Sequence, residues 1–110
     1  MELVSLKELC RLVNVSRRSI QCYEKAGLMM PTDKNKYGYL LYDRDAVSRA
    51  KMIKFLQETG FKLQEIKGLI NAPGSVLKTT LIGKLDELEK EKVRLESLIM
   101  RVNEYIENIN

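Results

Sequence analysis

A tight turn between two short helices is the feature that most constrains how this chain can fold. Residues 13–28 read VNVSRRSIQCYEKAGL, with an Asn-Val turn near the start. Ser16 is placed to cap a second helix, and Gly27 is placed to end it in the left-handed conformation. A Ser-x-x-Glu capping box opens the preceding helix, residues 5–13. Two short helices joined by so short a turn predict a helix-turn-helix.

The second helix carries two adjacent arginines in its first turn. Side chains that project from the start of such a helix can contact base edges in the major groove, whereas Arg, Lys and hydroxyl groups that bind phosphates set orientation only. Arg17 or Arg18 could pair with guanine or hold a phosphate, and both alternatives stay open. Ile20 and Tyr23 can face the core. The DNA contacts predicted from this helix are Ser16, Arg17, Arg18, Ser19, Gln21 and Tyr23.

A basic and aromatic segment follows, KNKYGYLLY at residues 34–42. We expect residues 31–35 to form a loop and residues 36–42 to form a strand of a β-hairpin, because side chains of alternating character predict a strand. Alternation sends one face inward, so Tyr42 is expected in the core. Lysines in such a hairpin supply charge, and tyrosines supply hydroxyl donors and apolar contact with sugars. The predicted DNA contacts are Lys34, Lys36, Tyr37 and Tyr39 in the hairpin, and Lys62 at the start of a later helix.

Two further helices complete the first domain. Asp43 or Asp45 can cap a helix over residues 44–58, and residues 63–70 form a short fourth helix. The segment NAPGS, residues 71–75, interrupts the chain because proline and glycine disfavour helix continuation. The predicted organisation is a DNA-binding domain at residues 1–71, a linker at 72–75 and a dimerisation helix at 76–110.

Beyond this break the chain reads as one long helix. Its apolar residues follow the four-three spacing of a coiled coil, with Lys92 in one apolar position. Lys92 either sets register and partner choice or extends its ammonium to water. Most of the stripe can be buried only by another chain, so the pattern predicts a homodimer. The residues expected in that interface are Leu81, Leu85, Leu88, Lys92, Leu95, Ile99, Val102, Ile106 and Ile109.

Charge and residue usage restrict the function classes. The net charge is +4, but residues 1–75 hold 13 Lys/Arg against 8 Asp/Glu, a net of +5, whereas residues 76–110 hold 6 against 7, a net of −1. The first part therefore attracts polyanions. Histidine is absent and there are two cysteines, so we expect no catalysis, no metal, no cofactor and a reducing cytoplasm. No apolar run could span a bilayer, and we expect no signal peptide and no membrane partner.

Four motifs, in order, resemble the MerR family of bacterial transcription regulators. They are V-S-x-R-[ST]-I at residues 15–20, Y-E-x-x-G-L at 23–28, G-Y-x-x-Y at 38–42 and L-x-E-I at 63–66. The resemblance implies a mainly α fold, a winged helix-turn-helix with a small β-hairpin wing, followed by a long coiled-coil helix that pairs antiparallel in a homodimer. It also implies that the dimer binds, bends and untwists pseudo-palindromic promoter DNA. Double-stranded DNA and RNA polymerase are the implied partners, and the cytoplasm, at the nucleoid, is the implied location.

Three features depart from the family pattern. Gln21 and Cys22 stand where relatives commonly have an arginine and an aromatic residue, and Leu40 replaces an arginine of the wing. Cys22 is interpreted as a small residue filling the place of the aromatic; the alternative is a reactive thiol near arginines. We also expect no effector domain after the long helix, because the chain ends with it.

Two other functions are compatible with these residues. The first is an architectural or excisionase-like factor that bends DNA without touching polymerase. The second is a coiled-coil interaction module with degenerate DNA binding, which the missing arginines at Gln21 and Leu40 favour. DNA affinity that is absent or insensitive to salt would support the second alternative.

Overall fold

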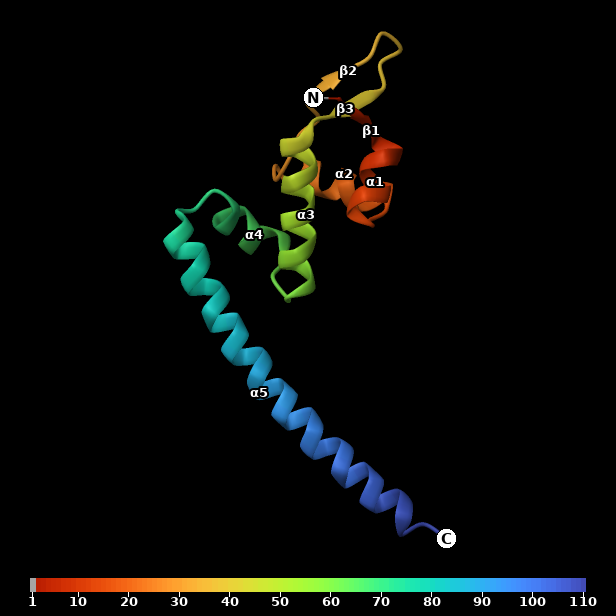
Figure 1. Ribbon diagram of the computed structural model, residues 1–110, viewed down its shortest axis with the longest axis vertical. Helices are drawn as coiled ribbons and strands as arrows, with labels where there is room; N and C mark the ends of the chain where they lie inside the picture. Colours follow the sequence, from red (N-terminus) through yellow and green to blue (C-terminus); the bar gives the residue numbers. More distant parts are fainter. Residues whose placement is uncertain (1) are drawn as a thin grey trace. The chain divides into compact units, whose positions relative to one another are not determined.

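The computed structural model describes residues 2–110, and helices predominate in it (Figure 1). The chain divides into two units between Ala72 and Pro73. The first unit holds four of the labelled helices and a small sheet, and the second unit is a single long helix. The elements are β1 (Val4–Ser5), α1 (Leu6–Val13), α2 (Arg17–Lys25), β2 (Asp33–Lys34), β3 (Leu40–Tyr42), α3 (Arg44–Glu58), α4 (Leu63–Ile70) and α5 (Gly74–Glu107).

Side-chain caps define where α1, α2 and α3 begin. The hydroxyls of Ser5 and Ser16 and the carboxylate of Asp43 each accept a hydrogen bond from the backbone N–H three residues later, at 2.8–3.1 Å. Each bond satisfies an amide that has no partner inside its helix and contributes about 1 kcal/mol. Asn14 (φ 60°) and Gly27 (φ 77°) turn the chain in the left-handed conformation after α1 and α2. The helix-turn-helix predicted from the sequence is confirmed.

The sheet is antiparallel throughout, with the strand order β1-β3-β2. Val4 of β1 lies opposite Tyr42 of β3, and Lys34 of β2 lies opposite Leu40 on the other side. β1 was not predicted, because two residues carry no periodicity and become a strand only by pairing with β3. The predicted loop at residues 31–35 is wrong in part, since it contains β2.

The predicted strand over residues 36–42 is also wrong in its first half. Asn35 Oδ1 accepts hydrogen bonds from Tyr37 N (2.9 Å) and Tyr39 N (3.0 Å), which folds the segment into a turn. Gly38 completes the turn with a positive φ of 83°. Only the second half of the predicted strand, β3, pairs in the sheet.

α3 is the central element of the first unit and contacts α1, α2, α4 and β3 (Figure 1). Burying each of its large apolar neighbours contributes about 1.5–3 kcal/mol relative to exposure. Tyr42 is fully buried, as predicted. The core residues are Leu9, Val13, Ile20, Tyr23, Leu28, Met29, Tyr42, Ala50, Ile53, Leu56 and Ile66.

The long helix begins earlier than predicted. It starts at Gly74 after an N-cap at Pro73, whereas the sequence suggested Val76 with a Ser75 cap. Proline tolerates this position because the first amides of a helix have no intrahelical acceptor. α5 is 34 residues long, about 51 Å at 1.5 Å per residue, and it ends before Ile109, which was predicted to be helical. None of the helices described is both long and apolar enough to cross a membrane.

Candidate nucleic-acid interface

One face of α2 is polar and exposed to solvent. Ile20 and Tyr23 are buried on the opposite face, with exposed fractions of 0% and 2%. Arg17, Arg18 and Gln21 are exposed, and within residues 2–110 their side chains make no hydrogen bond or ion pair. At 100° per residue these three side chains fall within about 100° of the helix circumference. The structure thus brings together three free polar groups at the start of the predicted recognition helix.

Two serines fix the first turn of α2. Ser16 Oγ accepts a hydrogen bond from Ser19 N (3.1 Å), and the two hydroxyls lie 3.1 Å apart. Ser16 is exposed and Ser19 is half-buried. The N-terminal end of α2, which carries the positive end of the helix dipole, lies beside two guanidinium groups, an arrangement suited to an anion.

Tyr23 does not lie where a DNA contact requires it. Its ring is buried, and its hydroxyl donates a hydrogen bond to Gln57 Oε1 of α3 at 2.7 Å. Burial also raises the pKa of the Tyr23 hydroxyl. The prediction that Tyr23 contacts DNA is corrected: this residue attaches α2 to α3.

The wing formed by β2, β3 and their connecting turn presents its polar groups to solvent. Lys34 and Lys36 are exposed, and so are Tyr37 (72%) and Tyr39 (69%). Lys36 Nζ lies 5.1 Å from the centre of the Tyr37 ring, within the range of a cation–π contact. All four predicted wing residues are accessible to a partner.

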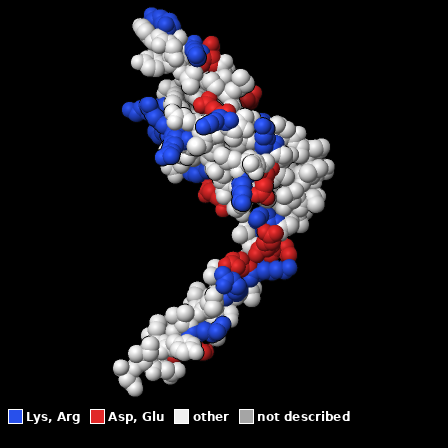
Figure 2. Space-filling view, turned by 180° about the vertical axis from the view of Figure 1, so that it is seen from behind, with Lys and Arg blue, Asp and Glu red and all other residues white. Residues whose placement is uncertain are grey.

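Lys and Arg side chains gather at the end of the wing and along the edge of the first unit that α1 and α2 form (Figure 2). Lys62, the remaining predicted contact, is exposed at the start of α4. Its backbone N–H donates to Glu65 Oε1 at 3.0 Å, which caps that helix.

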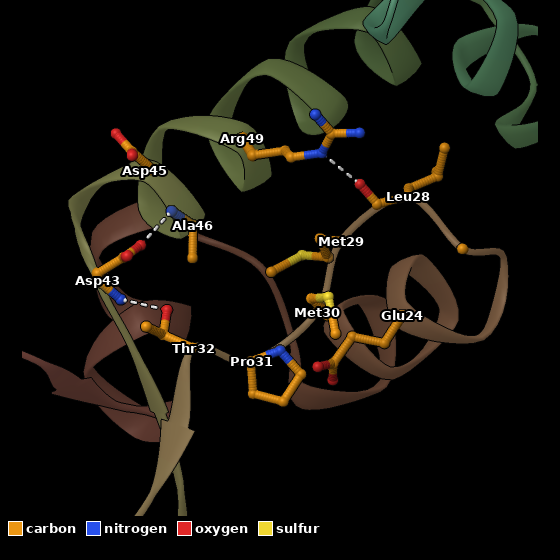
Figure 3. Close-up of a pocket in the computed structure, with 11 residues that line it drawn as sticks. Glu24, Leu28, Met29, Met30, Pro31, Thr32, Asp43, Asp45, Ala46 and Arg49 are labelled. Atoms are coloured by element: carbon orange, nitrogen blue, oxygen red, sulfur yellow. Dashed lines mark hydrogen bonds between the residues drawn. The ribbon is translucent and has the colours of Figure 1, made fainter.

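The segment between α2 and the wing is anchored to the start of α3 (Figure 3). Arg49 Nε donates to the carbonyl of Leu28 at 2.5 Å, and Arg49 Nη2 donates to Asn71 Oδ1 at 3.1 Å. Asp43 N donates to Thr32 Oγ1 at 2.9 Å. The bonds from Arg49 to Leu28 and from Asp43 to Thr32 border an open hollow of about 750 Å³ and fix the chain between α2 and the wing.

A second polar contact joins α2 to the sheet. The Tyr42 hydroxyl donates to the two carboxylate oxygens of Glu24, at 3.2 and 3.3 Å. Burial is the main cause that raises the pKa of Tyr42, and the neighbouring carboxylate raises it further. Burial likewise raises the pKa of Glu24, although the hydrogen bond from Tyr42 opposes this. The pair holds the central strand against the recognition helix.

The two cysteines occupy different environments. Cys10 is half-buried, and desolvation raises the pKa of its thiol, whereas Cys22 is exposed on α2. No group of three or more His, Cys, Asp or Glu side chains among the described residues could hold a metal ion.

A family model described as "MerR HTH family regulatory protein" matches residues 4–72, which is more than half of the chain. The chain belongs to the MerR family. This family consists of transcription regulators rather than enzymes. The match covers the helix-turn-helix, the wing and both following helices of the first unit.

Individual MerR-family relatives agree with this assignment. The HTH-type transcriptional activator mta of Bacillus subtilis is 30% identical over 98 residues, which is 89% of this chain and 38% of that protein. The crystal structure of MtaN, the N-terminal part of the multidrug transporter activator of B. subtilis, has a TM-score of 0.73 at 28% identity and covers 94% of this chain and 97% of that one. The chain spans about two fifths of the curated relatives that it matches first.

A second MerR-family structure shares the fold alone. It is HiNmlR, described as a MerR family regulator lacking the sensor domain and bound to promoter DNA, with a TM-score of 0.56 at 18% identity. Its match covers 96% of this chain and 80% of that one.

The residues that hold α2, the turn before it and the start of the wing in place were missed in the sequence analysis. Lys54, Gln57 and Arg49 of α3 and Thr32 before the wing bind groups 11–41 positions away in the chain. Motif spacing could not find them, because each acts across the fold. For Lys54 the sequence holds one signal, a lysine next to the apolar core position Ile53 of α3.

Proposed function

We propose that this MerR-family chain binds promoter DNA as a homodimer and regulates transcription by distorting it. Arg17, Arg18 and Gln21 would enter the major groove from α2. Lys34, Lys36, Tyr37 and Tyr39 of the wing would hold the flanking backbone, with Lys62 adding positive charge. The protein would act at the nucleoid in the cytoplasm, where RNA polymerase meets the same promoter.

The observation that carries this proposal is the free polar face of α2. Arg11, Arg49 and Lys54 of the same unit are all engaged by protein groups. Arg17 and Arg18, in contrast, make no hydrogen bond or ion pair within the described chain. Two unpaired guanidinium groups on one helix turn attract phosphate and guanine, which both accept paired N–H donors. The family membership and the fold shared with a promoter-bound regulator support the same function.

Dimerisation is proposed from the apolar stripe of α5. Leu81 is half-buried, the apolar residues of the stripe from Leu85 onward are 46–72% exposed, and no residue of the helix is buried. A solvated stripe of this length is unfavourable for a lone helix but suits a coiled coil. Two recognition helices would then reach half-sites in successive major grooves. Distorting that site costs about 1–6 kcal/mol, which the wing contacts would offset.

Selection of bound sequences from a random duplex pool at physiological salt tests the proposal. Enrichment of an inverted repeat is the expected result, because a two-fold dimer reads two equivalent half-sites. The matched control is the double variant Arg17→Ala/Arg18→Ala, which should enrich nothing. Weak, salt-sensitive binding without a motif would point to an architectural factor, and absent binding would point to an interaction module.

A further inference from the structure

The ammonium group of one lysine of α3 is hydrogen-bonded to another part of the protein. Lys54 Nζ donates a hydrogen bond to the carbonyl of Asn14 at 2.8 Å and a second to the carbonyl of Val13 at 3.2 Å. The two carbonyls lie at the end of α1, where Asn14 adopts φ 60° and the chain turns into α2. Lys54 therefore caps the turn of the helix-turn-helix from an element 40 residues further along the chain.

The chemistry of this contact suits a structural role. The last carbonyls of a helix have no intrahelical donor and carry partial negative charge, which an ammonium group stabilises. Two of the three N–H donors of Lys54 are engaged, and the side chain is only partly exposed. Lys51, one turn earlier in α3, is exposed and makes no such bond within residues 2–110.

A second contact from the same helix acts on α2 itself. Gln57, three residues after Lys54, accepts the hydrogen bond from the hydroxyl of Tyr23 at 2.7 Å. Lys54 thus holds the turn that precedes α2, and Gln57 holds the body of α2. Together they define how α2 is placed relative to α1 and α3.

We propose that Lys54 is a positioning residue for DNA recognition: it fixes the turn so that Arg17, Arg18 and Gln21 meet the DNA together, and it does not itself contact DNA. This inference rests on the proposed function. Loss of a cap that aligns α2 should weaken binding to the specific site, where several side chains must fit at once. Binding to unrelated duplex depends on charge and should change little.

The experiment compares Lys54→Met with Lys51→Met, which removes the same charge from the same helix but no hydrogen bond. The affinity of each variant is measured by fluorescence anisotropy on the selected operator and on a scrambled duplex, at several salt concentrations. Lys54→Met should weaken operator binding by about tenfold or more relative to Lys51→Met, since hydrogen bonds to a charged group are lost. The two variants should agree on the scrambled duplex and in salt dependence.

Two results would overturn the inference. One is equal operator affinity of Lys54→Met and Lys51→Met. The other is a Lys54→Met variant that binds both duplexes more weakly by the same factor and whose salt slope is lower by about one, which marks a phosphate contact. Lys54→Gln, which keeps N–H donors without charge, provides the same comparison if the methionine variant does not fold, and its operator affinity should lie between those of Lys54→Met and the unmodified chain. Failure of the unmodified chain to bind the operator would instead refute the proposed function.

Discussion

At the scale of single residues, Arg18 has a guanidinium that no group of the described chain engages, whereas Arg11 on α1 is hydrogen-bonded to Glu8. We predict that Arg18→Ala weakens operator binding by about 1–3 kcal/mol, roughly five- to 150-fold in Kd. If Arg18 pairs with guanine, one position of the selected motif should relax. If it binds phosphate, the motif should stay and the salt slope should fall.

Arg11→Ala is the control for Arg18→Ala, because it also removes one exposed guanidinium from the first unit. It should leave the motif unchanged. An Arg18→Ala protein with unaltered affinity and unaltered site preference would refute the role assigned to Arg18.

Gln21 is the neutral member of the same face, and its amide is free within residues 2–110. A glutamine amide matches the paired donor and acceptor of adenine in the major groove. We predict that the selected half-site contains an adenine whose preference disappears in Gln21→Ala, at a cost of about 1–3 kcal/mol on the operator. Repeating the selection measures this, and the salt slope should not change because no charge is lost. A motif identical to that of the unmodified chain would contradict it.

At the scale of elements, the helices could be predicted from the sequence because their signals are local. Ser16 and Gly27 mark the two ends of α2 within a dozen residues, and the structure uses both. The wing was less predictable, because Tyr37 and Tyr39 alternate as in a strand while Asn35 binds their amides and folds a turn. The alternating side chains favour a strand there, whereas the hydrogen bonds to Asn35 favour a turn, and the structure has the turn.

The candidate site shows the same division between local and distant information. The exposed positions of Arg17, Arg18 and Gln21 follow from helical periodicity, which the sequence displays. The burial of Tyr23 against Gln57 and the cap from Lys54 depend on how α3 packs. The exposed side chains that we propose as DNA contacts could thus be suggested from the sequence, whereas the bonds from α3 to α2 and its preceding turn could not.

The exposed side chains of the wing include two lysines and two tyrosines, and the amide oxygen of Asn35 is already hydrogen-bonded within the turn. We therefore expect the two lysines to bind backbone phosphates. We predict that Lys34→Gln/Lys36→Gln weakens operator and scrambled duplex similarly and lowers the salt slope by about two, with the motif unchanged. Binding titrations over a salt series measure the slope. Lys90→Gln is a single-charge control, because that lysine lies on α5 and pairs with Asp86 at 3.0 Å. A double wing variant that changes the motif would show that the wing reads sequence.

At the scale of the whole molecule, charge and apolar surface are divided between the two units. The net charge of +5 lies within residues 1–75, and the long apolar stripe lies on α5. Pairing two chains through α5 would bring two copies of the positively charged first unit to one duplex. Linking two weak half-site contacts can raise the overall affinity by about 10²–10⁴ without any new contact. Specific binding should therefore depend on α5 although α5 carries none of the predicted DNA contacts.

Leu95→Glu tests that dependence, because Leu95 lies in the middle of the stripe and a buried carboxylate without a partner is strongly unfavourable. We predict a monomer in sedimentation equilibrium and a loss of operator affinity of about 10²-fold or more, with half-site binding retained. Ser97→Glu adds the same charge about 200° around the helix from Leu95, outside the stripe, and should remain dimeric. A Leu95→Glu protein that stays dimeric would refute the coiled-coil interface. A monomer that still binds the full operator as tightly as before would show that α5 pairs for some purpose other than DNA recognition.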